Sequence, residues 1–274
     1  MAVGAKRAMA MAMAMDDYST LRYESANGVC RIILDRPPLN LIDEILTREY
    51  HDALRRADAD SSCRAIVLSG SGKGLSGGLD IKFVESFDQA EMEQFLRLFY
   101  VETIAICRKL SKPLITMVQG YAREGACTLA FGGDMIIAAD DADFGYPAVP
   151  NLAGPPGMHV WFLQRLIGRM KAAELIYTGE PITAVEAAAM GLITKVVPHD
   201  SLEGETLKLA EKIASMSPLA IQRTRQLMFD MEDMDFTKVP DVALKALSEA
   251  FSSEDSKEAR LAFREKRQPK WSNK

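Results

Sequence analysis

Short runs of apolar and β-branched residues alternate along the chain with segments in which apolar residues recur at helical spacing. Four of these runs predict buried strands, over Val29–Leu34, Ala65–Ser69, Leu114–Val118 and Met135–Ala138. The segments between them predict helices over residues 42–57 and 90–110, and another helix from Gly125. The apolar face of the first helix consists of Ile42, Ile45, Leu46, Leu54 and Ala57. Alternating strands and helices are typical of an α/β architecture.

From about Met158 onward the pattern is almost entirely helical, apart from a short predicted strand over Leu192–Val197. Pro218 is expected to begin a helix, since proline suits the first helical position. We therefore predict an α/β core over residues 16–200 and a helical C-terminal region over residues 201–274. Residues 1–15 are rich in Ala and Met and too weakly apolar for a secretory signal, so we expect a disordered end or an overcalled start.

Composition and charge exclude several classes of protein. The chain has 48% apolar and 26% charged residues, which excludes a disordered chain. Its net charge of −5 and the lack of a basic run argue against nucleic-acid binding. No apolar run approaches the length of a membrane span. Four dispersed cysteines and three dispersed histidines indicate no metal site and reduced thiols in a cytoplasm.

Two glycine-containing segments each follow a predicted buried strand. Gly72–Gly77 matches the spacing of a dinucleotide fingerprint, but the helix and strand that such a unit needs do not follow. What remains is a bend over Ser76–Asp80 that leaves backbone N–H groups open to a ligand. The second segment, Gln119–Cys127, enters a helix. Each alone is most often a turn, but N–H groups from two strand ends together could form an oxyanion hole.

At these segments the chain resembles the crotonase superfamily, also called the enoyl-CoA hydratase/isomerase family. Ser76–Lys82 and Gln119–Asp134 are similar to its two oxyanion segments. Further similarities, in chain order, are Asp35–Asn40, Phe144–Pro147, Tyr177–Glu180, Ala189–Ile193, Val196–Pro198 and Glu265–Arg267. So many ordered matches cover nearly the whole chain.

The resemblance implies a spiral of ββα repeats that assembles as a homotrimer or a dimer of trimers. It implies an acyl-CoA substrate, with coenzyme A as part of that substrate and no separate cofactor. The oxyanion N–H groups would belong to Leu79 and Gly125, and would stabilise an enolate-like thioester oxygen. Coenzyme A would contact Leu39, Gly77, Leu79, Ile81 and Lys82, while Phe263 and Lys266 would close over the nucleotide, from the same or a neighbouring subunit.

The chain departs from the family at its acid and base positions. Hydratases of the family use two glutamates, and this chain has Thr128 and Ala148 at those positions. Neither side chain can act as a carboxylate at neutral pH. Because many isomerases keep the second glutamate, double-bond isomerisation is also in doubt.

Other side chains near these positions could transfer protons. Tyr146 would share a face with Ala148 in an extended segment, or else pack with its hydroxyl group at the surface. Glu124 precedes the oxyanion glycine, where the helix N-terminus favours a permanently ionised structural role over catalysis. Arg123 would pair with Glu124 or meet an acidic acyl group. His159 is more often a packed or capping histidine, and Asp80 is expected to cap the helix that it begins.

Two functions from different classes remain. The first is an acyl-CoA enzyme of the lyase or isomerase type that catalyses atypical hydration, hydrolysis or decarboxylation. The second is a catalytically silent protein that binds CoA thioesters, as the missing glutamates suggest. RNA binding is disfavoured by the acidic charge.

Overall fold

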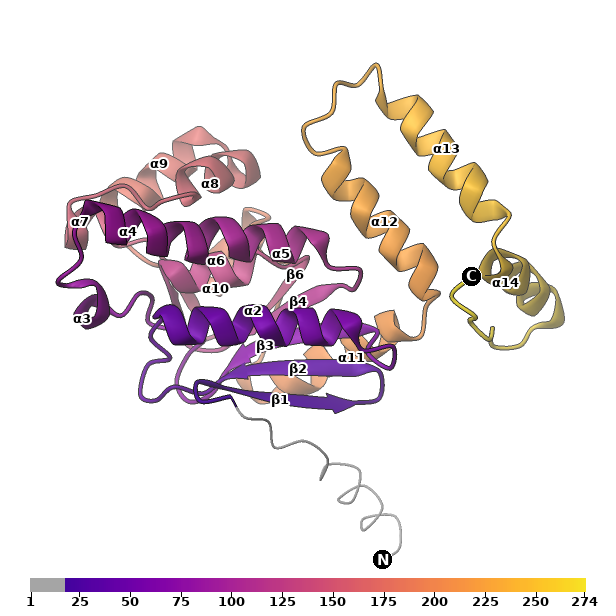
Figure 1. Ribbon diagram of the computed structural model, residues 1–274, viewed down its shortest axis with the longest axis horizontal. Coiled ribbons are helices and arrows are strands. Elements are labelled where there is room, and N and C mark those ends of the chain that lie inside the picture. Colours follow the sequence, from indigo (N-terminus) through magenta and orange to yellow (C-terminus); the bar gives the residue numbers. More distant parts are fainter. Residues whose placement is uncertain (1–17) are drawn as a thin grey trace, which may run out of the picture.

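The main element of the structure is a six-stranded sheet with the strand order β1-β2-β3-β4-β6-β9 (Figure 1). The computed structural model describes residues 18–274, so the predicted N-terminal segment 1–15 lies outside the described residues. The strands are β1 (Leu21–Ala26), β2 (Val29–Leu34), β3 (Ala65–Gly70), β4 (Leu114–Val118), β6 (Met135–Ala139) and β9 (Lys195–Val197). Only the β1–β2 pair in this sheet is antiparallel; the other strands run parallel.

A smaller sheet is built from β5 (Tyr121–Arg123), β7 (Asp143–Gly145) and β8 (Ile182–Thr183), in that order. Strand β5 follows β4 after two residues, and β7 follows β6 after three. The chain therefore passes twice from the end of a parallel strand of the large sheet into the small sheet. The candidate site lies at this transition.

Helices cover the large sheet, and Figure 1 shows α2 in front of it and α11 behind it. Every residue of β3 and β4 is buried, as expected for central strands covered on both faces. The helices of the core are α2 (Glu44–Ala59), α3 (Ile81–Val84), α4 (Gln89–Leu96), α5 (Thr103–Lys109), α6 (Gly125–Phe131), α7 (Ala148–Leu152), α8 (His159–Ile167), α9 (Arg169–Thr178) and α10 (Ala184–Ala189). A π-helical segment, Arg97–Glu102, joins α4 to α5.

The C-terminal region consists of a 3-10 turn, His199–Ser201, followed by four helices. These are α11 (Leu202–Ala214), α12 (Pro218–Asp230), α13 (Val239–Phe251) and α14 (Glu254–Glu265). Helices α12 to α14 extend away from the sheet (Figure 1). Within residues 18–274, no helix is both long enough and apolar enough to cross a membrane.

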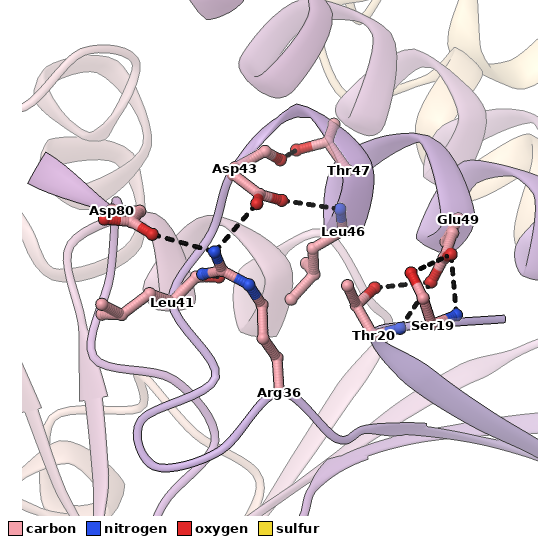
Figure 2. A network of polar contacts seen from close by, with 9 residues as sticks. All are labelled: Ser19, Thr20, Arg36, Leu41, Asp43, Leu46, Thr47, Glu49 and Asp80. Carbon is pink, nitrogen blue, oxygen red and sulfur yellow. Dashed lines mark hydrogen bonds and ion pairs between the residues drawn. The ribbon is translucent and has the colours of Figure 1, made fainter. Parts of the chain in front are cut away.

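Helix α2 is fixed at its start by two carboxylates (Figure 2). Asp43 caps the helix, and its side chain accepts a 2.8 Å hydrogen bond from the Leu46 backbone N–H. One turn further on, the Glu49 carboxylate accepts hydrogen bonds from the backbone N–H and hydroxyl groups of both Ser19 and Thr20. The chain that leads into β1 is thereby attached to the helix.

The predicted α/β order and the four principal strands are confirmed. Ile42 precedes α2, and Ile45 is 56% exposed, so the predicted apolar face was wrong at these two residues. The strand predicted over Leu192–Val197 is shorter, because only Lys195–Val197 pairs with β6. The three short strands of the small sheet were not predicted, since two or three residues show no periodicity.

Arg225 attaches the C-terminal helices to the core. Its side chain is 4% exposed and forms a 2.9 Å ion pair with Asp134, at the start of β6. The same guanidinium donates 2.5 Å hydrogen bonds to the carbonyl oxygens of Cys107 and Leu110, at the end of α5. One buried cation therefore satisfies a carboxylate and two carbonyl groups at a helix C-terminus.

We predict that Arg225→Met lowers the free energy of unfolding by about 3–5 kcal/mol, because it leaves the Asp134 carboxylate and two carbonyl groups without their partner. Arg97→Met is the control, since the Arg97–Glu93 pair is exposed and should contribute less than about 1 kcal/mol. Urea unfolding of both variants measures the difference, and equal losses would contradict the prediction.

Candidate active site

The two glycine-containing segments lie side by side where β3 and β4 end. The Leu75 N–H donates to the Tyr121 carbonyl oxygen at 2.9 Å, and the Arg123 N–H donates to the Ser76 carbonyl oxygen at 3.2 Å. Gly78 has a φ of +95°, and a side-chain carbon there would lie 2.9 Å from the Arg123 carbonyl oxygen. The close approach of the two segments therefore requires glycine at this position.

Leu79 and Gly125, the two predicted oxyanion donors, are linked through Ile42. Ile42 forms a parallel bridge with Leu79, and its Cδ1 atom lies 3.0 Å from where a side-chain carbon on Gly125 would be. Among residues 18–274, the backbone N–H groups of Leu79 and Gly125 donate no hydrogen bond to the protein. Gly125 is the first residue of α6, where N–H groups have no partner inside the helix.

Arg36 attaches the segment that contains Leu79 to the start of α2 (Figure 2). Its Nη2 atom lies 3.0 Å from a carboxylate oxygen of Asp43 and 3.0 Å from one of Asp80, and its Nη1 atom donates to the Leu41 carbonyl oxygen. Asp80 occupies the N-cap position of α3, but its side chain makes no capping hydrogen bond. The predicted cap was therefore wrong, because the carboxylate binds Arg36. The sequence does not single out Arg36, since an arginine in a turn is usually solvated.

Glu124 is buried directly before Gly125. The residue is 7% exposed, and one oxygen of its carboxylate accepts a 3.2 Å hydrogen bond from the Ala148 backbone N–H. Burial raises the pKa of Glu124 to about 7, against an ordinary value of 4.5, and the Ala148 N–H only partly offsets this. The expectation of a permanently ionised carboxylate at a helix N-terminus was therefore wrong. The Glu124 side chain makes no capping hydrogen bond to α6, and desolvation is the largest cause of the raised pKa.

Arg123 does not neutralise Glu124. Its guanidinium forms an ion pair with Asp143 of the neighbouring strand β7, so the expected pairing with Glu124 was wrong. The β5–β7 register explains this pairing. Asp143 lies opposite Tyr121, two residues before Arg123, and side chains two residues apart in a strand point to the same face of the sheet. Glu124 follows Arg123 directly and therefore does not share that face.

Thr128 and Ala148, the residues at the usual glutamate positions, are both buried. The Thr128 hydroxyl group lies 2.8 Å from Nε2 of His159, which opens α8. His159 is therefore packed, as expected, and it also carries a specific polar contact. Burial lowers the pKa of His159 to about 4, so the imidazole is neutral.

Tyr146 is 1% exposed, and its hydroxyl group is buried without a hydrogen-bond partner among the described residues. The alternative of a hydroxyl group at the surface was therefore wrong. The premise of an extended segment through Ala148 was also wrong, because β7 ends at Gly145 and Ala148 begins α7. The ring of Tyr146 packs edge-on against that of His159, with centroids 4.9 Å apart.

The predicted coenzyme A contacts fall into two groups. Leu39, Ile81 and Lys82 are exposed near the Leu79 segment, and the Gly77 N–H donates to the Leu39 carbonyl oxygen at 2.8 Å. Phe263, which is 85% exposed, and Lys266 belong to the C-terminal end of the chain. Figure 1 places α14 on the opposite side of the molecule from α3, so these two residues do not reach the site within one chain.

A separate cavity of about 290 Å³ lies at the other end of the sheet, lined by residues such as Asp58, Arg64 and Lys112 that precede β3 and β4. It is remote from the candidate site, which follows these strands. In the part of the chain that the structure describes, no group of three or more His, Cys, Asp or Glu side chains could hold a metal ion.

Comparison with known proteins identifies the class to which this fold and site belong. Residues 24–274 match the enoyl-CoA hydratase/isomerase family. A Rhizobium meliloti (strain 1021) protein named "Probable enoyl-CoA hydratase" is 36% identical over 261 residues, covering 94% of this chain and 99% of the relative. A Dictyostelium discoideum protein named "Probable enoyl-CoA hydratase, mitochondrial" is 35% identical over 261 residues, covering 94% and 92%. A crystal structure of an enoyl-CoA hydratase from Bacillus anthracis has a TM-score of 0.89 at 29% identity, covering 93% of this chain and 100% of that one.

The fold is thus the crotonase fold, as the resemblance implied. The chain belongs to the enoyl-CoA hydratase/isomerase family, a family of lyase- and isomerase-type enzymes that act on acyl-CoA substrates.

We predict that Gly78→Ala destabilises the protein more than Gly72→Ala. Both residues have positive φ, but a side-chain carbon at Gly72 would meet no atom within 4 Å. Gly72→Ala should cost about 1 kcal/mol for backbone strain, and Gly78→Ala about 1–3 kcal/mol more for the close approach to Arg123. Urea unfolding measures both, and equal costs would mean that the two segments can move apart freely.

We also predict a pH dependence of stability that belongs to Glu124. The raised pKa favours the protonated carboxyl group in the folded state, so this contribution is complete below about pH 4.5 and is lost as the pH rises to about 7. Relative to Glu124→Gln, the wild type should lose about 1 kcal/mol of unfolding free energy per pH unit in this window. Urea unfolding at pH 5, 6, 7 and 8 tests this, and a constant difference between the two proteins would refute it.

Proposed function

We propose that this protein is an acyl-CoA enzyme that stabilises an enolate of its thioester substrate in an oxyanion hole. The donors would be the backbone N–H groups of Leu79 and Gly125. The observation that supports this is the presence of two N–H groups without protein acceptors on two segments that pack side by side. Two fixed donors aimed at one oxygen stabilise the charge that develops there, and one such donor is typically worth about 3–4 kcal/mol.

The reaction that follows enolate formation differs from ordinary two-glutamate hydration. Thr128 and Ala148 supply no carboxylate, so atypical hydration, hydrolysis and decarboxylation are the candidates that the oxyanion hole alone would serve. The same two residues favour the second candidate, a catalytically silent protein that binds CoA thioesters. Measuring turnover of CoA thioesters distinguishes the enzyme from the silent binding protein.

Coenzyme A would bind as part of the substrate, with no separate cofactor. Leu39, Gly77, Ile81 and Lys82 would contact it next to Leu79, and the exposure of Leu39, Ile81 and Lys82 beside Leu79 supports this. Phe263 and Lys266 would come from a neighbouring subunit of a homotrimer or a dimer of trimers. Support comes from α13, on which Leu244, Leu247 and Phe251 are exposed in the single chain. The four unpaired cysteines support a cytoplasmic location.

The test uses a dienoyl-CoA thioester, whose absorbance moves to longer wavelength when hydrogen bonds polarise its carbonyl group. We expect this shift with the wild type and with Gly125→Ala, which keeps the N–H group. Gly125→Pro lacks the N–H group while placing proline at the first position of a helix, and it should lose most of the shift. With any substrate that turns over, it should lose 10²–10³-fold in kcat.

Crotonyl-CoA, malonyl-type and β-keto acyl-CoAs are then screened for turnover, and thermal unfolding checks that both variants fold. An absorbance shift without turnover of any thioester would favour the silent binding protein. No binding of any thioester would refute both candidates.

A further inference from the structure

Three buried polar atoms without hydrogen-bond partners lie on three side chains around the candidate site. They are Oε1 of Glu124, the hydroxyl oxygen of Tyr146 and Nδ1 of His159. The three residues are 7%, 1% and 2% exposed. The Tyr146 hydroxyl group has the Cys127 thiol as a weak polar neighbour, and the His159 imidazole has the Glu124 backbone. Oε1 of Glu124 is therefore the atom of the three that lacks a polar neighbour among the described residues, and a buried carboxylate oxygen without a partner is costly, as at a site that binds a polar ligand.

Contacts connect these side chains to the two positions where the family resemblance implies glutamates. The Glu124 carboxylate reaches the backbone of Ala148, at 3.2 Å from its N–H group. The His159 imidazole reaches Thr128 at 2.8 Å, and Tyr146 packs on that imidazole. The site is therefore not merely depleted of acid and base groups. A carboxyl group from a different segment lies beside position 148.

The backbone of Glu124 is held in an unfavourable conformation. Its φ of 44° and ψ of −104° lie in a region that residues other than glycine rarely adopt. Such strain persists only where the surrounding structure enforces it, and it is concentrated at functional sites. The Glu124 N–H donates to the Gly145 carbonyl oxygen at 2.9 Å, which holds the residue in this conformation.

No cation compensates Glu124. The ionisable groups around it are Tyr100 from the π-helical segment, Cys127 from α6, Tyr146 from the segment between β7 and α7, and His159 from α8. Burial raises the pKa of both tyrosines and of Cys127, so all three stay protonated, while His159 stays neutral. The remaining charged groups on the adjoining strands, Arg123 and Asp143, are paired with each other. Glu124 alone in this cluster changes charge near neutral pH.

We propose that Glu124 is the proton-transfer residue of this site, acting alone next to the oxyanion glycine. The proposal rests on the oxyanion hole of the proposed function and adds double-bond isomerisation to its candidate reactions. The doubt about isomerisation came from the missing glutamate at position 148, and the Glu124 carboxylate lies beside that position. One carboxylate without a second acid fits the movement of a proton along the acyl chain better than the addition of water, which needs a separate base and acid. The substrate would be a β,γ-unsaturated acyl-CoA.

This double-bond shift needs no co-reactant. The Glu124 carboxylate takes a proton from the α carbon, and the electron pair of that C–H bond forms a dienolate whose charge is on the thioester oxygen. The Glu124 carboxylic acid then returns the proton to the γ carbon. The double bond moves from the β,γ to the α,β position, and the carboxylate is regenerated.

The experiment follows the conversion of but-3-enoyl-CoA to crotonyl-CoA by the rise in conjugated enoyl absorbance. Glu124→Gln keeps an oxygen that can accept from the Ala148 N–H but cannot exchange a proton. It should lower kcat by at least about 100-fold and leave the Kd for the thioester within about threefold. Asp141→Asn removes an exposed carboxylate elsewhere and should leave kcat unchanged.

The wild-type pH profile provides a second measurement that does not depend on the folding of a variant. Because the ionised carboxylate is the base, kcat/KM should rise with pH and level off above about pH 7. A flat profile between pH 5.5 and 9, or a Glu124→Gln variant with more than a tenth of wild-type kcat, would overturn the proposal.

The two proposals fail in different ways. Binding with the expected absorbance shift but without proton transfer would overturn the role of Glu124 and leave the oxyanion hole standing. The absence of thioester binding would overturn both.

Discussion

The site depends on one constraint. The segments that follow β3 and β4 stay hydrogen-bonded to each other beyond the end of the large sheet. Hydrogen bonds between Leu75 and Tyr121 and between Ser76 and Arg123 extend the pairing of the two strands into their loops. This extension presses Gly78 against the Arg123 carbonyl group, and Ile42 then fixes Leu79 relative to Gly125. Two segments far apart in the sequence are thereby held together through the backbone and the side chain of Ile42.

The same constraint explains why a glutamate can be strained and buried directly before α6. The pairing of β5 with β7 holds the backbone up to Glu124, whose own N–H bonds to Gly145, and α6 begins directly after it, so the residue cannot relax to a negative φ without disturbing one of these elements. The Arg123–Asp143 ion pair adds to this hold and keeps the neighbouring guanidinium from pairing with the Glu124 carboxylate. Strain, burial and the raised pKa of Glu124 are therefore consequences of one local arrangement.

The sequence predicts the alternation of strands and helices because buried strands contain apolar runs such as Ala65–Leu68, and it predicts the pairing of the two glycine segments through the family resemblance. It does not predict the state of Glu124, because the helix dipole is readable from the sequence while desolvation depends on which groups surround the carboxyl group. The same limit applies to Asp80 and Arg123, whose partners Arg36 and Asp143 are 44 and 20 residues away in the chain. Asp80 was expected to cap the adjacent helix and Arg123 to pair with the adjacent Glu124, whereas both side chains bind partners that are distant in the sequence.

The buried surroundings of Glu124 favour a reaction in which a negative charge moves from the carboxylate to the substrate over one that adds a second negative charge to the site. A resting Glu124 carboxylate and an enolate are both anions, and a buried cluster of neutral groups would tolerate two of them poorly. In the proposed reaction, the charge of Glu124 would disappear as the charge on the thioester oxygen develops, so the net charge of the site would stay constant. Burial makes Glu124 a stronger base than an exposed glutamate, and in the proposed oxyanion hole the N–H groups of Leu79 and Gly125 would stabilise the oxygen that receives the charge. The environment that destabilises the carboxylate at rest is thus the one that drives its proton transfer.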